Sequence, residues 1–150
     1  MFFPIMIDIE NMNIIIVGGG KIGYKKAKFI SQLGKKVKVI SKEFCSDFNK
    51  NEFEVELVKK EFQMSDLEEA DIVYAALDNS KLNTDIANYC KINRILVNSV
   101  DDRKKSNFIN TGFFTEKIED TDVMVSVSTF GNNCKMARDL RDELKAYLED

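Results

Sequence analysis

Ile14-Ile15-Ile16-Val17-Gly18-Gly19-Gly20-Lys21-Ile22-Gly23 is the stretch that decides the fold of this chain. An apolar run of strand length leads directly into a G-x-G-x-x-G pattern, and apolar residues at helical spacing follow from Lys21 to Gly34. A second run of strand length, Val37-Lys38-Val39-Ile40, comes next. The pattern therefore lies within a β-α-β unit, the context in which it is typical of dinucleotide binding.

The glycines of this pattern have a physical role in such a unit. Gly18, Gly20 and Gly23 let the chain turn tightly and let backbone amides approach a pyrophosphate. The amino end of the helix adds unpaired N–H groups and a favourable dipole. Because Lys21 and Ile22 fall in the first helical turn, we expect their backbone to border the cofactor. The alternative is a glycine-rich turn without a ligand.

Bulk properties fit one small globular chain. It has 150 residues, 44% of them hydrophobic, and a formal net charge of −3. That balance argues against a general affinity for nucleic acid. The apolar runs are too short to cross a membrane, and the opening residues 1–7 have neither a basic start nor a cleavage site. We therefore expect a cytoplasmic protein.

Two residue types limit the available chemistry. Histidine is absent, which removes His-ligated metals and the usual general base near neutral pH. Cys45, Cys90 and Cys134 are far apart, so neither a disulfide framework nor a zinc site is indicated. No metal site is predicted, and acid–base chemistry must fall to Asp, Glu, Lys, Tyr or Cys.

Strands and helices alternate along the first two thirds of the chain. We expect strands at about 13–17, 36–40, 53–58, 71–76 and 95–97, and helices at about 22–33 and 80–91. Residues 3–9 form an extended lead-in or an edge strand, and the spacing of Ser65 and Glu68 suits the capping box of a short helix. The alternation implies an α/β, Rossmann-like fold, a parallel sheet with helices on both faces.

The pattern changes after Asp102. Residues 108–115 and 123–129 predict two strands with no helix between them, and 134–148 predicts an amphipathic helix. We therefore expect a Rossmann domain at 1–102 and a dimerisation segment, a β-hairpin plus helix, at 103–150. A second copy of the chain would cover the hairpin. The residues expected on the inner side of the helix are Met136, Ala137, Leu140, Leu144, Tyr147 and Leu148.

Polar residues follow several predicted strands and should meet at one edge of the sheet. They are Gly18, Ser41, Asp78 with Asn79, and Asn98 with Ser99. Asp78 and Asn79 are candidates for the cofactor site, or they only cap the next helix. Asn98 would line the nicotinamide side, or serve as a loop hydrogen-bonder.

The second strand ends without its usual ribose-binding acid. Ser41 stands in that place, followed by Lys42 and Glu43. Glu43 lies about twenty residues past Gly23, which makes it a candidate ribose ligand. Lys42 would tolerate a 2′-phosphate, so NADP stays open beside NAD. Lys42 and Glu43 are alternatively solvated loop charges.

Seven stretches follow one another in the order of a known family. Two of them are Ile15-Ile16-Val17-Gly18-Gly19-Gly20-Lys21-Ile22-Gly23 and Ile95-Leu96-Val97-Asn98-Ser99-Val100-Asp101-Asp102; the others lie at 3–8, 75–83, 106–109, 125–131 and 137–141. Together they resemble the dehydrogenase module of siroheme biosynthesis, the precorrin-2 dehydrogenase and siroheme synthase amino-terminal family. The resemblance spans nearly the whole chain.

The resemblance implies an activity, a partner and site residues. It implies NAD-dependent oxidation of precorrin-2 to sirohydrochlorin and homodimerisation through the carboxyl-terminal half. Some members of the family also insert iron, so ferrochelatase activity stays open. Asp101 takes the place of the catalytic aspartate; without the resemblance it would be a turn or helix cap. Basic residues that suit the carboxylates of precorrin-2, or that are simply solvated surface, are Arg103, Lys104 and Arg138, with Lys105, Lys135 and Arg141.

This chain also departs from the family pattern. Phe130 replaces a glycine, and Asn133-Cys134 replaces a Ser-Pro pair. The chain stops at Asp150, so we expect the usual carboxyl-terminal helical domain to be absent. Either a short enzyme suffices, or a partner or second subunit completes the site.

Two other functions fit parts of the sequence. One is a nucleotide-sensing regulatory module without catalysis. Such modules commonly keep an acid where this chain has Ser41, and they give no reason for residues 97–101 or the strand pair. The other is a dimeric chelatase scaffold whose dehydrogenase activity has been lost.

Overall fold

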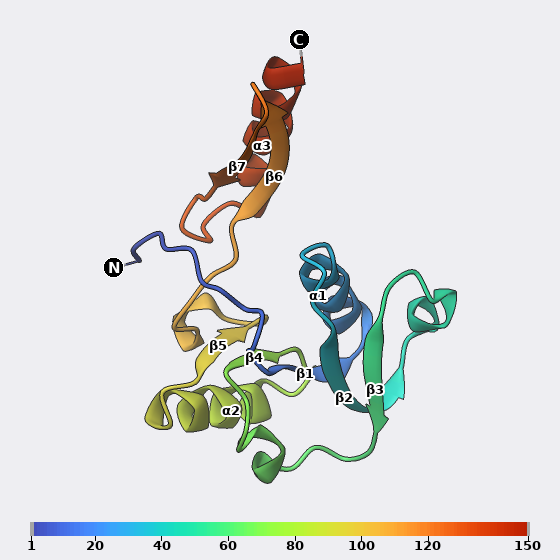
Figure 1. Ribbon diagram of the computed structural model, residues 1–150. Helices are drawn as coiled ribbons and strands as arrows, with labels where there is room; N and C mark the ends of the chain where they lie inside the picture. Colours follow the sequence, from blue (N-terminus) through green and yellow to red (C-terminus); the bar gives the residue numbers. More distant parts are fainter. Residues whose placement is uncertain (1, 150) are drawn as a thin grey trace. The chain divides into compact units, whose positions relative to one another are not determined.

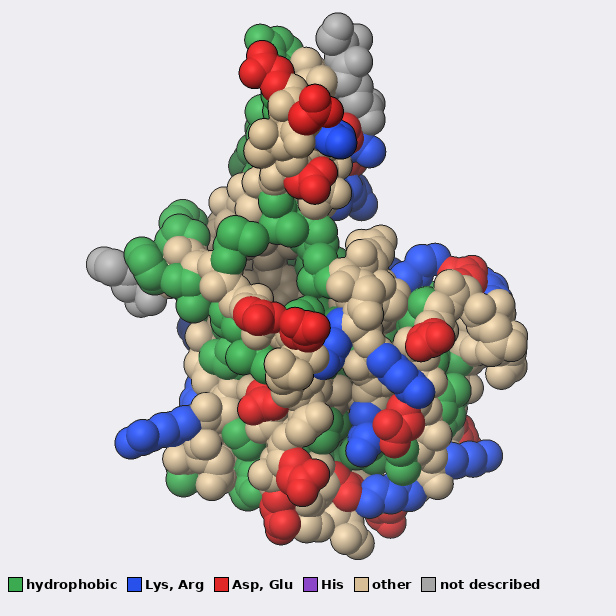
Figure 2. Space-filling model, in the orientation of Figure 1, with side chains coloured by type: hydrophobic (Ala, Val, Ile, Leu, Met, Phe, Trp, Pro, Cys, Tyr) green, Lys and Arg blue, Asp and Glu red, His purple; other side chains and the backbone are tan. Residues whose placement is uncertain are grey.

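The computed structural model describes residues 2–149, and they divide into two compact units. The larger unit is Phe3–Phe108, and the smaller one runs from Ile109 onward and includes Phe2 (Figure 1). No helix among these residues is both long and apolar enough to cross a membrane. On the face shown in Figure 2, basic and acidic side chains are intermixed over the larger unit.

A parallel five-stranded sheet forms the larger unit, in the order β3-β2-β1-β4-β5. This confirms the predicted α/β, Rossmann-like fold. The strands are β1 (Ile14–Gly19), β2 (Val37–Phe44), β3 (Val55–Lys59), β4 (Ile72–Ala75) and β5 (Leu96–Ser99). The helices are α1 (Lys21–Ser31) and α2 (Ser80–Ile92), with short 3₁₀ turns η1 (Ser46–Lys50), η2 (Met64–Leu67) and η3 (Arg103–Lys105).

Two apolar layers cover the two faces of this sheet. Successive side chains of a strand point to opposite faces. Ile15 and Val17 therefore pack into the layer that contains residues of α2, whereas Ile14 and Ile16 pack into the layer that contains residues of α1. Because both faces of β1 are buried, every position from Ile14 to Val17 is apolar.

Strand β2 continues past its expected end at Ile40. Val17 pairs with Ile40, but Gly19 pairs with Phe44, so β2 carries extra residues in a bulge. The Cys45 N–H closes this pairing by donating to the Gly19 carbonyl at 2.8 Å. The bulge depends on contacts with β1. Local spacing alone does not reveal such contacts, so the strand predicted from it was too short.

One other local expectation is wrong, and another is decided between its two alternatives. The capping box of η2 uses Gln63 and Asp66 instead of Ser65 and Glu68: the Gln63 N–H donates to Asp66 Oδ2 at 2.9 Å. Residues 3–9 form no strand, so of the two alternatives the structure shows the lead-in.

The segment after η3 runs along the outer edge of β5. Asn107 donates its N–H to the Val97 carbonyl at 3.0 Å, and its Oδ1 accepts the Val97 N–H at 2.7 Å. The Ser106 hydroxyl accepts the Ser99 N–H at 2.9 Å. These bonds hold the segment to the sheet, and the compact unit accordingly extends to Phe108, past the Asp102 at which the sequence pattern changes.

The smaller unit is an antiparallel hairpin with one helix, as predicted. Its elements are β6 (Gly112–Ile118), β7 (Thr121–Val127) and α3 (Cys134–Glu149), and α3 packs on both strands. Phe130, where the family pattern has glycine, takes a φ of 54°, in the left-handed region that favours glycine.

The apolar stripe of α3 does not face its own hairpin. Of the residues predicted on the inner side, Ala137 lies on the half-buried face, and the prediction was wrong for the other five. The half-buried positions are Ala137, Arg141 and Lys145, four residues apart on one face. Lys145 Nζ lies 3.9 Å from Glu116 Oε1 of β6. Exposed instead are Met136, Leu140, Leu144, Tyr147 and Leu148, which are 40–78% accessible. Within this unit, therefore, nothing covers the apolar stripe among the described residues.

Candidate cofactor and acid–base site

The turn between β1 and α1 is crowded at three of its glycines, Gly18, Gly19 and Gly23. Gly18 has a φ of +118°, and a Cβ built on it would lie 2.3 Å from the Ala76 carbonyl oxygen. A Cβ on Gly23 would lie 2.0 Å from the Gly18 carbonyl oxygen. A Cβ on Gly19 would lie 2.4 Å from the Glu43 carbonyl oxygen, so the fold itself requires glycine at all three positions.

Gly20 differs, because the fold does not require glycine there. Its φ is −75°, and a Cβ built on it would meet no atom within 4 Å. The open space lies at the N-cap of α1, where the first-turn amides of Lys21, Ile22 and Gly23 have no helical acceptor. No described side chain caps this end, and the first turn contains no acidic residue. The turn therefore fits the diphosphate of a dinucleotide.

Residues 41–43 lie in the bulged part of β2. The Ser41 Cβ would be 2.9 Å from a Cβ on Gly19, so this small side chain borders the glycine turn. Lys42 Nζ lies 2.8 Å from Glu61 Oε1, with both side chains exposed. Glu43 places its carbonyl oxygen against Gly19, and its side chain is exposed. The charge of Lys42 is thus already paired.

The loop between β4 and α2 is held by an asparagine to which no motif assigns a role. The fully buried Asn83 accepts the Leu77 N–H at 3.2 Å and donates to the Leu77 carbonyl at 2.8 Å. Asn79 caps α2 by accepting the Leu82 N–H at 3.0 Å. Asp78 lies between Leu77 and Asn79 in the sequence, with an exposed side chain. Asn83 therefore positions the loop that presents Asp78.

Asp101 follows β5 and is held through both carboxylate oxygens. The Ser99 hydroxyl donates to Oδ1 at 2.6 Å, and Lys105 Nζ donates to Oδ2 at 2.7 Å. Partial burial acts to raise the pKa of Asp101, but hydrogen bonds from Lys105, Ser99 and Ser80 outweigh it and hold that pKa well below its usual range. The capping role belongs to its neighbour Asp102, whose Oδ1 accepts the Lys104 N–H at 2.9 Å.

The remaining candidate residues lie in different settings. Asn98 is 8% exposed, and its Nδ2 donates to the Phe108 carbonyl at 3.1 Å. Arg103 and Lys104 are exposed on η3, close in sequence to Asp101. Arg138 belongs to the smaller unit, where its Nε lies 3.6 Å from Asp139 Oδ1. The predicted site residues other than Arg138 thus all belong to the larger unit.

The glycine turn and Asp101 lie at the same edge of the sheet. Both follow the carboxyl ends of parallel strands, and β4 is the strand between β1 and β5. The Ala76 N–H donates to the Val17 carbonyl at 2.8 Å, and the Val100 N–H donates to the Ala75 carbonyl at 3.1 Å. Strand order reverses at β1 and β4, which is where ligands bind in such sheets.

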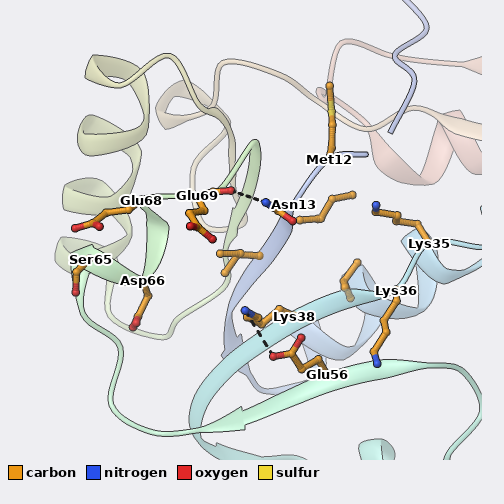
Figure 3. A pocket seen from close by; sticks show the side chains of 13 residues that line it. Met12, Asn13, Lys35, Lys36, Lys38, Glu56, Ser65, Asp66, Glu68 and Glu69 are labelled. Atoms are coloured by element: carbon orange, nitrogen blue, oxygen red, sulfur yellow. Dashed lines mark hydrogen bonds and ion pairs between the residues drawn. The ribbon is translucent and has the colours of Figure 1, made fainter. Parts of the chain in front are cut away.

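A hollow of about 370 Å³ lies at the opposite, amino edge of the sheet (Figure 3). It is bordered by charges of both signs, including Lys38, whose Nζ lies 3.6 Å from Glu56 Oε1. Asn13 Nδ2 donates to the Glu69 carbonyl at 2.9 Å on its far side. This hollow is remote from the glycine turn, because the two edges are separated by the length of the strands.

Comparison with known proteins gives a family and a set of relatives. The family model described as "Putative NAD(P)-binding" matches residues 5–112. Siroheme synthase from Enterobacter sp. is 32% identical over 147 residues, which cover 97% of this chain and 31% of that protein. Siroheme synthase from Buchnera aphidicola is 31% identical over 149 residues, which cover 98% of this chain and 31% of that protein. The chain thus spans about a third of the length of these curated relatives.

A solved structure shares the fold. SirC, a precorrin-2 dehydrogenase, superposes with a TM-score of 0.76 at 18% sequence identity, over 97% of this chain and 70% of that chain. The likeness extends over both the parallel sheet and the hairpin with its helix.

Proposed function

Because this chain belongs to the NAD(P)-binding family whose model covers residues 5–112, we propose that it is a precorrin-2 dehydrogenase, which oxidises precorrin-2 to sirohydrochlorin with NAD. One observation carries the proposal: the open glycine turn and a fixed carboxylate, Asp101, lie at one sheet edge with a single strand between them. Relatives named siroheme synthase and the fold of SirC support the same pathway. The proposal includes the cytoplasmic location expected from the sequence.

In this proposal the cofactor is held at the carboxyl edge of β1, β2 and β4. The amides of the first turn of α1 bind the diphosphate, beside Gly18, Gly20 and Gly23. Ser41 and Glu43 border the ribose, and Asp78 and Asn98 the nicotinamide side. Pairing of Lys42 with Glu61 supports NAD over NADP, because a 2′-phosphate would have to compete with a carboxylate for that ammonium. When bound, NAD supplies the acceptor for a hydride.

Asp101 is the proposed proton acceptor. Oxidation of the macrocycle removes a hydride and protons, and a carboxylate beside the substrate takes a proton. The Asp101 side chain is a quarter exposed, so it combines firm anchoring with access to a ligand. Arg103 and Lys104 follow Asp101 on η3, where their positive charges suit substrate carboxylates. Arg138 of the smaller unit is assigned the same role.

We include a homodimer in the proposal. Met136, Leu140, Leu144 and Leu148 recur every fourth residue on α3, and each is at least 40% exposed. A continuous apolar stripe on a helix is a typical association surface. A second copy of the same stripe would cover it in a two-fold arrangement.

Assays with purified protein test the proposed reaction. Precorrin-2 and NAD should give sirohydrochlorin and NADH in equal amounts, with slower turnover when NADP replaces NAD. Tight nucleotide binding without turnover would contradict the proposal and support a regulatory module.

The described residues include no group of three or more His, Cys, Asp or Glu side chains that could hold a metal ion. Iron insertion is measured separately, by siroheme formation from sirohydrochlorin and Fe²⁺; siroheme formation without NAD reduction would indicate a chelatase instead.

A further inference from the structure

Lys105 joins the end of β5 to the start of α2. Its Nζ donates to Asp101 Oδ2 at 2.7 Å, to Ser80 Oγ at 2.8 Å and to the Ser80 carbonyl at 3.2 Å. An ammonium group has three N–H donors, and each therefore has an acceptor within the protein. The side chain is 17% exposed. Lys105 thus has no donor left for a substrate carboxylate, in contrast with its exposed neighbour Lys104.

The backbone that presents Lys105 is itself held to the sheet. Ser106, the next residue, accepts the Ser99 N–H through its hydroxyl, and Asn107 bonds both backbone groups of Val97. Ser99 in turn donates its hydroxyl to the other oxygen of Asp101. Both carboxylate oxygens of Asp101 are therefore hydrogen-bonded, one to Ser99 of β5 and the other to Lys105, whose segment is bonded to β5.

Lys105 Nζ is paired with this carboxylate at 2.7 Å. Asp102 directs its carboxylate at the Lys104 N–H, and Arg103 is exposed on η3. On the α2 side, the nearby charged residues in the sequence are Asp78 and Lys81, and both are exposed. The Lys105 ammonium lies 2.7 Å from a carboxylate oxygen of Asp101. It therefore interacts with this carboxylate more strongly than the exposed charges do, because water weakens their interaction.

We propose that Lys105 is a positioning residue: it holds Asp101 as an oriented, ionised carboxylate and ties it to the first residue of α2, directly after the loop that carries Asp78. The proposal deepens the proposed function and rests on it for the catalytic role of Asp101. Lys105 keeps its proton throughout. The proton released by the substrate moves to the Asp101 carboxylate and then to solvent, and the ammonium serves as a fixed counter-charge.

Lys105→Met tests this proposal, with Lys81→Met as the matched control. Both remove one positive charge near the start of α2, but Lys81 is exposed and makes no bond to Asp101 in the described structure. The first readout is the titration of the Asp101 carboxyl carbon by NMR without substrate. Its pKa should rise by about one unit or more in Lys105→Met and stay at the parent value in Lys81→Met. Lys105→Arg should restore most of the shift.

The second readout is the pH dependence of kcat/KM for precorrin-2. In Lys105→Met the acidic limb should move to higher pH, with the KM for precorrin-2 unchanged. A raised KM with an unmoved limb would overturn the proposal, because it would make Lys105 a substrate-binding residue. An unchanged NMR titration would also overturn it. If the NMR titration moves and the limb does not, the Asp101–Lys105 coupling holds and the catalytic role of Asp101 fails. Ser80→Ala removes both one acceptor of the ammonium and a hydrogen bond to Asp101, so it should shift both readouts less in the same direction. Lys105→Gln replaces Lys105→Met if that variant does not fold.

Discussion

The buried Asn83 side chain hydrogen-bonds both the N–H and the carbonyl of Leu77. These bonds replace those that a neighbouring strand would have made if β4 had continued to Leu77. The chain leaves the sheet at Leu77. Without Asn83, the N–H and the carbonyl of this partly buried residue would lack protein partners. Asn83 lies in the first turns of α2, so the same side chain fixes the distance between the helix and the strand end.

Replacing Asn83 with Ala should destabilise the fold by about 2–3 kcal/mol, because two backbone groups lose their partner. The free energy of unfolding from urea titration measures this. Asn93→Ala is the control: Asn93 Nδ2 donates to the Tyr89 carbonyl at the exposed end of the same helix. The control should lose much less. Equal losses of unfolding free energy in both variants would show that the bonds to Leu77 stabilise the fold no more than the exposed bond of Asn93 does.

Gly20 and Gly23 should separate cofactor binding from folding. Gly20→Ala places a methyl group in the open space at the α1 N-cap, so NADH affinity should fall about tenfold or more while the melting temperature stays near the parent value. Gly23→Ala drives a methyl group against the Gly18 carbonyl and should lower the melting temperature sharply. NADH fluorescence and thermal unfolding give the two readouts. Unchanged NADH affinity in Gly20→Ala would contradict the diphosphate site.

The sequence predicts those parts of the site that depend on local pattern. Glycines after an apolar run indicate the β1–α1 turn, and strand alternation places Gly18 and Asp101 at one edge. The bulge in β2 was missed because it depends on the bond from Cys45 to Gly19, which forms only between neighbouring strands. The contact between Lys105 and Ser80 depends on how η3 packs on α2. In the sequence, 25 residues separate the two, so nothing in the local pattern indicates it.

The outward apolar stripe of α3 shows a different limit. Periodicity correctly predicts an amphipathic helix, but it does not say which partner the apolar face meets. Within the chain, Ala137, Arg141 and Lys145 face the hairpin, and the stems of the long side chains supply the packing. An arginine or lysine at such a position has the composition of a surface residue. Sequence alone therefore assigned the wrong face to every residue predicted on the inner side except Ala137.

Asp101→Asn should lower kcat for precorrin-2 oxidation by about a hundredfold or more, because the amide cannot accept the proton. NADH affinity should remain at the parent value, since the glycine turn is unaltered. Stopped-flow absorbance of sirohydrochlorin formation measures the first quantity. Turnover at the parent rate would assign the proton acceptor elsewhere.

The same carboxylate should make stability depend on acid. The pKa of Asp101 is lower in the folded protein than in the unfolded chain, so ionisation stabilises the fold. This contribution is fully present above the unfolded pKa of about 4 and is lost as the pH falls toward the folded value. The parent should therefore lose more stability than Asp101→Asn between about pH 5 and pH 2. Urea unfolding at several pH values tests this, and parallel losses would contradict it.

The cysteines should differ in reactivity. Burial raises the pKa of the Cys90 thiol to about 12, whereas Cys134 is exposed at the start of α3. Since the thiolate is the reactive form, a disulfide reagent at pH 8 should modify Cys134 first and Cys90 only after unfolding. Mass spectrometry of digested protein identifies the sites. Modification of Cys90 in folded protein would show that α2 opens readily.

Leu140→Asp should separate a dimer into monomers. Leu140 lies in the middle of the exposed stripe and is 43% accessible, so a second copy of α3 would bury its side chain against an apolar surface. A carboxylate there would be desolvated without a partner, and dimer affinity should fall by about a hundredfold. Ile92→Asp is the matched control, because Ile92 is 81% exposed at the end of α2, outside the stripe. Sedimentation equilibrium should give twice the chain mass for the parent and the control, and the chain mass for Leu140→Asp. A monomeric parent, or a dimer that survives the substitution, would show that something other than a second copy covers the stripe.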